Sequence, residues 1–212
     1  MPDEVTDMTN EALLELMTNR REAYAFLSRL FREEISREFL EAMTEIGFLA
    51  QLTTLEKRLD SSFPAEKHCN FVKYLRLIKK ENTEEILKEL HVDYARVFLG
   101  LAKPSAHPYE SLYVDSTGLV MGKAFDEVKR AYAEAGLSKR SNFVEPEDHV
   151  TLELEFMSHL SEKIIKTLKH HRKYATHLLN PQKNFLKEHV IKWVPEFCDR
   201  VVATAQTDFY KA

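Results

Sequence analysis

The chain has 212 residues, of which 44% are hydrophobic and 30% are charged, so it can bury a core of one domain or two small ones. A formal net charge of -4 gives no basic face for a nucleic acid to bind. The two cysteines, Cys69 and Cys198, are far apart and lack a Cys-x-x-Cys spacing, which excludes a zinc-finger pattern and a disulfide scaffold. We expect both to be reduced, half-buried thiols.

Apolar residues recur at helical spacing through the first 99 residues, and only five glycines occur in the whole chain. The expected helices are marked by the apolar positions Leu13, Leu16, Met17, Tyr24, Leu27 and Phe31, then Phe39, Met43 and Ile46, then Phe71, Leu75 and Ile78, and then Ile86, Leu87, Leu90, Tyr94, Val97 and Phe98. Gly47 should end the second helix and Pro64 should start the third. Asn82 with Glu85 resembles a capping box and predicts the fourth start.

Helical spacing stops between Gly100 and Gly118, where Pro104 and Pro108 exclude a continuous helix. The segment 112–114 could be briefly extended. Loops this long in a compact domain are usually functional or disordered, and this one carries aromatic residues. We therefore expect the loop at about 100–118 to form one wall of a binding groove and a hinge between two helical halves, about 1–99 and about 119–212, of a single domain.

Apolar residues at helical spacing also predict helices in the second half of the chain. Gly136 stands in a C-cap position after an apolar stripe, and Asn180-Pro181 should start another helix, which Pro195 must kink or end. No apolar run approaches the roughly 18 residues that suggest a membrane span. The fold class predicted from these patterns is an all-α helical bundle.

A helix start at Glu145-Pro146-Glu147-Asp148-His149 opens the most apolar helix of this half. Proline at the first helical position and acids in the first turn are typical of a helix N-terminus. A charged imidazole is unfavourable there, so His149 should be neutral or paired with a carboxylate, such as Glu153 or Glu145.

Three segments in order resemble the TorD/DmsD/NarJ family: 94–100 (YARVFLG) with 107–113 (HPYESLY), then 145–149 (EPEDH), then 185–197 (FLKEHVIKWVPEF). Members of this family are cytoplasmic chaperones that mature molybdenum-containing redox enzymes exported by the twin-arginine route. The part of the chain before residue 94 resembles the family only in its helical pattern. The resemblance implies a TorD-like bundle and a chaperone without a catalytic site.

The resemblance also implies a partner: the catalytic subunit of a molybdopterin oxidoreductase with its signal peptide. Arginine pairs well with carboxylates, and an apolar segment fits a helix-lined groove. Asp148, with Glu110 and Glu147, would receive the two arginines, and His149 would fix the loop or bond to the peptide backbone. The residues expected along the apolar part of the peptide are Tyr94, Phe98, Pro108, Tyr109 and Tyr113. A tryptophan that some relatives carry where Tyr109 stands is absent, which would affect which signal peptides fit.

Some relatives are reported to bind guanine nucleotides, but the chain has no nucleotide fingerprint, and we expect no cofactor and no metal. The acidic start, unlike a secretory signal, is consistent with a cytoplasmic location. We expect a monomer, although the long loop would also permit a domain-swapped dimer.

Two other functions stay open at this point. A metal-dependent enzyme could use His149, Glu153, Glu155 and His159, although the paired Glu-x-x-His motifs of di-iron bundles are absent. A generic helical adaptor could bind a folded partner and ignore leader peptides. Without the resemblance, Asp148 and His149 would be read as a structural ion pair at a helix start.

Overall fold

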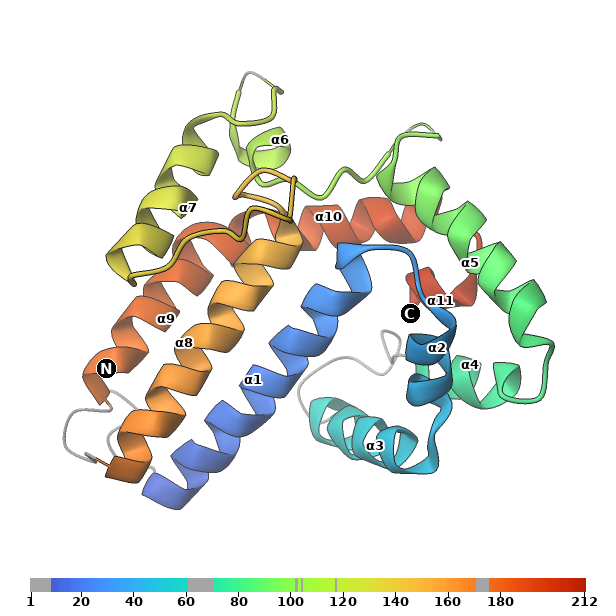
Figure 1. Cartoon of the computed structure of the whole chain (residues 1–212), viewed down its shortest axis with the longest axis horizontal. Coiled ribbons are helices and arrows are strands. Elements are labelled where there is room, and N and C mark those ends of the chain that lie inside the picture. The colour runs from blue at the N-terminus through green and yellow to red at the C-terminus, as the bar shows by residue number, and fades with distance from the viewer. Residues whose placement is uncertain (1–8, 61–70, 102, 104, 117, 171–175) are drawn as a thin grey trace. The chain divides into compact units, whose positions relative to one another are not determined.

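The computed structural model describes residues 9–60, 71–101, 103, 105–116, 118–170 and 176–212 (Figure 1). Regular structure in these ranges is helical, and the only β-type pairing among them is one isolated bridge. The all-α prediction is therefore confirmed. The expected helix start at Pro64 and the thiol of Cys69 lie outside the described residues.

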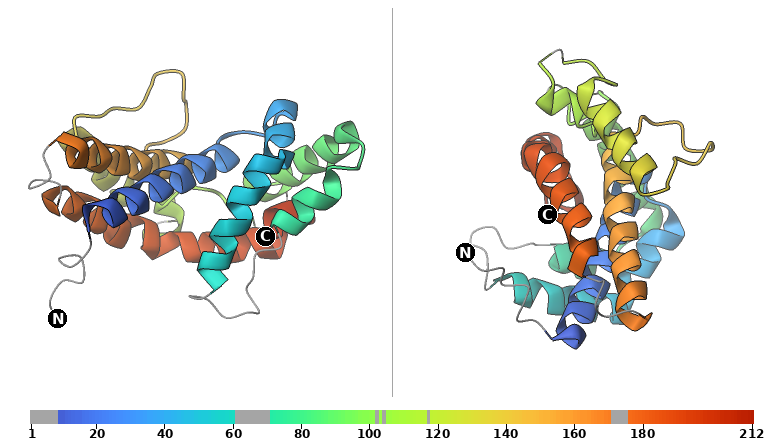
Figure 2. Two further views of the ribbon diagram at one scale, coloured as in Figure 1. Left: turned by 90° about the horizontal axis from the view of Figure 1, so that it is seen from below. Right: turned by 90° about the vertical axis from the view of Figure 1, so that its left-hand side faces the viewer.

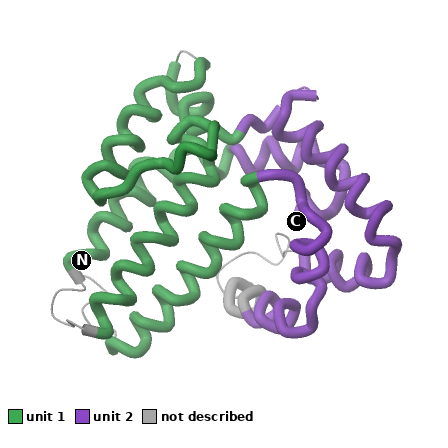
Figure 3. Tube along the Cα trace, viewed as in Figure 1, with its two compact units in different colours: residues 1–32, 108–196 green, residues 33–107, 197–212 purple. Residues whose placement is uncertain are grey.

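The chain forms two compact units, each built from segments distant in sequence (Figure 3). Unit 1 comprises residues 1–32 and 108–196, and unit 2 comprises residues 33–107 and 197–212. This grouping differs from the expected halves on either side of the loop at about 100–118. The reason is that α1 packs along α8 within unit 1, while the C-terminal α11 packs on α4 within unit 2.

Unit 1 contains α1 (Asn10–Arg32), α6 (Ser111–Val114), α7 (Lys123–Glu134), α8 (Val150–His170), the 3-10 turn η4 (Thr176–Leu178), α9 (Leu179–Phe185), the π-helical turn η5 (Leu186–Val190) and the start of α10 (Ile191–Thr204). The long helices α1 and α8 lie side by side (Figure 2). Ser28 and Thr151 join them, because each hydroxyl bonds to the other residue's carbonyl.

The core of unit 1 surrounds α8 on two sides. One cluster contains Val128, Tyr132, Leu152, Phe156, Met157, Leu160, Phe185 and Val190, and the other contains Leu13, Met17, Ile164, Ile165 and Leu168. The helical periodicity of the sequence accounts for both clusters, since residues three and four apart share a face.

Unit 2 contains α2 (Arg37–Thr44), α3 (Ile46–Asp60), α4 (Phe71–Ile78), α5 (Thr83–Phe98), the end of α10 and α11 (Asp208–Lys211). The Asn82 side chain accepts a hydrogen bond of 3.0 Å from the Glu84 N–H, so the expected cap of α5 is present. Buried Asp93 accepts bonds from the backbone N–H groups of Gln206 and Thr207 and so fixes the approach to α11.

Three expectations about local structure were wrong. Residues 112–114 are not extended, because they belong to the short helix α6. Gly47 does not end the second helix, because α2 ends at Thr44 and Gly47 lies within α3. Cys198 is exposed and not half-buried. Of the two outcomes expected at Pro195, a kink or a helix end, the end is excluded, because α10 continues to Thr204 after the π-helical turn η5. In the described part of the chain, no helix is both long and apolar enough to cross a membrane.

Candidate functional site

The two loop segments that carry most of the predicted site residues pair with each other inside unit 1. The Val150 N–H donates to the Pro108 carbonyl over 2.9 Å, and the Glu110 N–H donates to the Asp148 carbonyl over 3.0 Å. Between these bonds Tyr109 and His149 form an antiparallel bridge. This pairing explains why α8 begins at Val150 and not at Pro146, as the sequence suggested, since backbone groups of the preceding residues bond to another segment.

Asp148 lies at the centre of this pairing and is fully buried. Its Oδ2 accepts a 3.0 Å bond from the Ser111 N–H and a second bond from the Ser111 hydroxyl. The Ser111 oxygen in turn accepts from the Gly122 N–H over 3.2 Å. In this conformation the Asp148 carboxylate therefore holds α6 and the start of α7 and does not face an incoming arginine.

Glu110 is also buried, and its carboxylate faces His189, with 3.0 Å between Oε2 and the imidazole Nδ1. Nearby, the Trp193 indole N–H donates over 3.0 Å to buried Glu153. Burial raises the pKa of Glu153 well above its usual range, and the charge of Glu110 raises it further. Glu153 is thus held as a neutral acid beside the Glu110 carboxylate.

His149 is buried between two aromatic rings. Its ring centroid lies 5.2 Å from that of Tyr109 and 5.8 Å from that of Phe143. Burial lowers the pKa of His149 to about 4, so the imidazole is neutral near pH 7. The Thr151 N–H donates over 3.1 Å to Nδ1, which places the ring proton on Nε2.

Two further carboxylates of this region keep some exposed surface. Glu145 accepts a bond from the Tyr109 hydroxyl, and Glu147 lies 3.4 Å from the Lys139 ammonium. An arginine that reached Glu147 would therefore compete with a lysine already present.

The nine predicted residues are divided between the two units. Pro108, Tyr109, Glu110, Tyr113, Glu147, Asp148 and His149 belong to unit 1, and Tyr94 and Phe98 belong to unit 2. Both of these rings are buried, with their centroids 5.0 Å apart and Phe98 packed on Tyr210. They are core residues of unit 2. Pro108 is buried as well, whereas Tyr109 and Tyr113 are partly exposed.

The sequence reasoning missed Glu153, His189 and Trp193 as parts of one polar cluster. A signal was present, because Glu153 stands within the densest apolar stretch of α8, where a carboxylate needs a buried partner. The partner could not be read from spacing, since Trp193 lies on a different helix.

The metal-enzyme alternative does not fit the arrangement. Within the described ranges, no group of three or more His, Cys, Asp or Glu side chains could hold a metal ion. Two of the four side chains considered as metal ligands have other partners. Glu155 forms an ion pair with Arg32, and Glu153 accepts a hydrogen bond from the Trp193 indole N–H.

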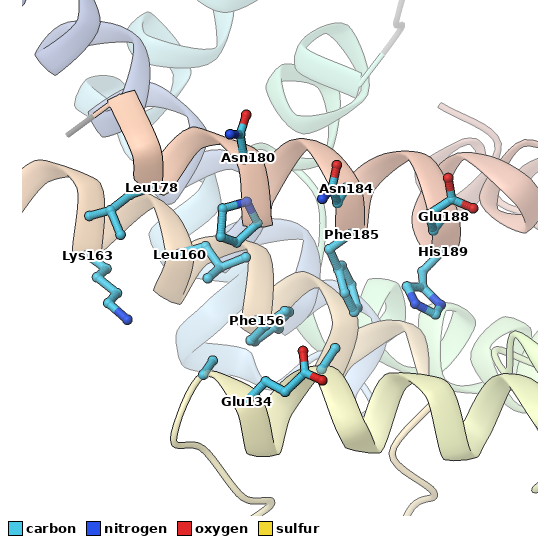
Figure 4. A pocket seen from close by; sticks show the side chains of 13 residues that line it. Glu134, Phe156, Leu160, Lys163, Leu178, Asn180, Asn184, Phe185, Glu188 and His189 are labelled. Carbon is cyan, nitrogen blue, oxygen red and sulfur yellow. The ribbon is translucent and has the colours of Figure 1, made fainter. Parts of the chain in front are cut away.

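A pocket of about 560 Å³ opens in unit 1 between α7, α8 and α9 (Figure 4). Its apolar lining consists of Ala131, Ala135, Phe156, Leu160, Leu178, Pro181 and Phe185. Its polar lining consists of Glu134, Lys163, Asn180, Asn184, Glu188 and His189. The sequence analysis did not find this pocket, which we call the α7–α9 groove. His189 belongs to both the groove and the buried cluster around Glu110.

Comparison with known proteins decides the family. Residues 58–199 match the model of the family described as nitrate reductase delta subunit. The chain belongs to this family. The chain is therefore a TorD-like chaperone of redox enzyme maturation and not an enzyme, as the motifs at 94–113, 145–149 and 185–197 predicted.

Similar relatives within the nitrate reductase delta subunit family cover most of the chain. The chaperone protein TorD of Vibrio cholerae El Tor Inaba N16961 is 28% identical over 203 residues, which are 93% of this chain and 86% of the relative. That of Photobacterium profundum is 28% identical over 91% of this chain and 86% of the relative. A solved structure, described as a candidate redox enzyme maturation protein from Archaeoglobus fulgidus, aligns with 23% identity and a TM-score of 0.38 over 79% of this chain and 93% of that one. A score of this size does not establish a shared fold.

Proposed function

We propose that this chaperone binds the twin-arginine signal peptide, the apo form, or both, of a molybdopterin-dependent oxidoreductase subunit in the cytoplasm. Occupancy would hide the leader from the export machinery until the cofactor is installed and the enzyme has folded. The observation that carries the proposal is the family match over residues 58–199.

We assign two roles to the predicted residues, and their burial supports this assignment. Asp148, Glu110 and His149 are buried and hydrogen-bonded within the protein, so they act by positioning the segments 108–114 and 145–150. Tyr109, Tyr113 and Glu147 are partly exposed and are proposed to contact the peptide. A fixed pairing of loops lowers the entropy cost of binding, because the contact residues are already ordered.

Affinity capture from the anaerobic cytosol of the native organism tests this function. The tagged chaperone should retain a molybdopterin oxidoreductase precursor whose N-terminal leader is uncleaved, as read by mass spectrometry. Recovery of the mature enzyme alone, or of folded proteins without a leader, would favour the adaptor function and contradict the proposal.

A further inference from the structure

Buried polar side chains from three segments of unit 1 meet in one cluster, which we call the Glu110–Glu153 cluster and which consists of Glu110, Glu153, His189 and Trp193. The Glu110 carboxylate lies 3.0 Å from the His189 imidazole, and the Trp193 indole N–H donates to Glu153 over 3.0 Å. Glu110 precedes α6 and Glu153 belongs to α8, whereas both of their partners come from η5 and the start of α10. The cluster therefore joins these three segments.

The π-helical turn η5 sets the direction in which His189 points. The Ile191 N–H bonds to the Leu186 carbonyl, five residues back, so this turn holds one residue more than an α-helical turn. Figure 4 shows His189 on the same side of its helix as Phe185, whereas Glu188 points to the opposite side. His189 is 8% exposed and lines the α7–α9 groove, so its imidazole connects the buried acids to solvent.

The two carboxyl groups of the cluster hold a proton between them. Burial raises the pKa of Glu153 well above its usual range, and the charges of Glu110 and Asp148 raise it further. Glu153 Oε1 is buried, and no hydrogen-bond donor reaches it among the described residues. We therefore place the proton on this oxygen, from which it can be donated to the Glu110 carboxylate. A second carboxylate charge in the same buried space has a large cost in free energy.

Titratable groups from the neighbouring elements act on the cluster, and they are Tyr132 of α7, Asp148 before α8, Glu188 of η5 and Lys192 of α10. Two of them are acids. Burial and the nearby acids raise the pKa of Tyr132, so the phenol is neutral. Lys192 is exposed and pairs with Glu188 over 2.9 Å. None of these four groups therefore compensates a second buried carboxylate charge.

The segment 109–115 is the part of the cluster that can move. It holds Glu110 against His189, and its Tyr113 ring centroid lies 5.3 Å from that of Trp193. Glu153 belongs to the long helix α8, which packs in both core clusters of unit 1, whereas the segment 109–115 contains only the short helix α6. Two repelling carboxylates therefore separate by movement of this segment and not by movement of α8.

We propose that the Glu110–Glu153 cluster is a pH-sensitive switch, which keeps the segment 109–115 closed on η5 and α10 while Glu153 holds its proton and lets the segment open when this proton passes to solvent. In the open form water surrounds both carboxylates and weakens their repulsion. A protonated His189 pairs with Glu110, so the loss of the imidazole proton favours the open form as well. The switch is a property of the fold and does not depend on the proposed peptide.

The sign of the pH dependence follows from the proton count. The closed form keeps the Glu153 proton at a pH where the open form has lost it, because the pKa of this carboxyl is raised only when it is buried. Opening therefore releases a proton and becomes more favourable as the pH rises from about 4.5 to the raised pKa of the closed form. Acid closes the segment, and alkali opens it.

Amide hydrogen exchange on the full chain measures this opening residue by residue. The N–H groups of Glu110, Tyr113 and Val114 are hydrogen-bonded in the closed segment. Glu153→Gln keeps an acceptor for the Trp193 indole and cannot ionise. Between pH 5 and pH 8, protection at these three amides should fall at least about tenfold more in the wild type than in Glu153→Gln. Glu155→Gln is the matched control, because it neutralises an exposed acid of the same helix, and it should behave as the wild type does.

Trp193 offers a second readout, because it is the only tryptophan of the chain and its indole N–H gives a single NMR signal. The signal should titrate with pH in the wild type and should not titrate in Glu153→Gln. Glu110→Gln should lower the midpoint by about one pH unit, because it removes the neighbouring charge that helps to keep Glu153 neutral. A hydrogen bond with a merely structural role would give a signal that is the same at every pH.

Two results would overturn the switch. One is equal protection in the segment 109–115 and in the middle of α8, at Met157, at every pH, since the segment would then open only when the whole fold does. The other is a Trp193 signal that is constant between pH 5 and pH 10, or that titrates in the same way in Glu153→Gln. No peptide takes part in either measurement, so both results leave the proposed function standing.

Discussion

The Ser111 N–H donates a 3.0 Å hydrogen bond to the carboxylate of Asp148, thirty-seven positions away in the chain. This bond joins the loop before α8 to the start of α6, and the Ser111 hydroxyl extends the contact to Gly122. Asp148, which we expected to receive an arginine of the leader, is thereby engaged inside the protein.

Replacing Asp148 by Asn should therefore reduce stability as well as leader binding. The new amide N–H₂ would be buried where Oδ1 now has no hydrogen-bond partner among the described residues, at a cost of about 1–3 kcal/mol in the free energy of unfolding. Urea unfolding and calorimetry with the leader measure the two effects. Ser111→Ala, which removes the hydroxyl bond to the Asp148 carboxylate, should weaken binding in the same direction. Lost binding in Asp148→Asn at unchanged stability, with normal binding in Ser111→Ala, would show direct contact with arginine.

The lowered pKa of buried His149 predicts that the protein loses stability in acid. Its pKa is lowered by burial from 6.5 to about 4, so the unfolded chain takes up a proton first, and stability declines as the pH falls from about 6.5 to about 4. The contribution lost over this range is about 3 kcal/mol. Proton NMR should give a midpoint near 4 for the His149 ring, and His149→Asn should flatten this part of the pH profile. Exposed His177→Gln serves as the control. A midpoint near 6.5 would contradict the buried, neutral imidazole.

The raised pKa of Glu153 predicts the opposite pH dependence, a loss of stability as the pH rises. Its folded-state pKa is raised by burial and by Glu110, so its contribution is fully present below about 4.5 and is lost as the pH rises through the folded pKa. Glu153→Gln resembles the neutral acid and cannot ionise. Its stability relative to wild type should therefore increase steadily with pH, as measured by denaturant unfolding between pH 4 and pH 9. A difference that is the same at every pH would show that Glu153 is not buried as a neutral acid.

A substitution at Phe98 tests whether the aromatic residues of α5 belong to the core or to the peptide site. Phe98→Ala should lower the free energy of unfolding by about 3–5 kcal/mol, because a buried ring packed on Tyr210 is removed. The folded fraction should bind the leader with wild-type affinity. Leu99→Ala, at the exposed neighbouring position, should change neither quantity appreciably. Weakened binding in Phe98→Ala without a loss of stability would assign the ring to the peptide.

Helical periodicity predicted the all-α class and most helices, because one buried face per helix leaves a local pattern in the sequence. The start of α8 was misplaced because Pro146, Glu147 and Asp148 satisfy the local rules for a helix start, and the pairing with residues 108–110 that prevents it is not local. For the same reason the partners of Glu153 and the α7–α9 groove could not be read from spacing. The division into units depends on α1 meeting α8, which no local pattern records.

The central claim is tested most directly by titrating the full-length protein with the isolated leader of the precursor that it captures, and with the same peptide after both arginines are replaced by glutamine. The account predicts saturable one-to-one binding of the native leader and clearly weaker binding of the glutamine peptide, with the difference shrinking as salt is added. No binding of the native leader, or equal affinity for both peptides, would contradict it.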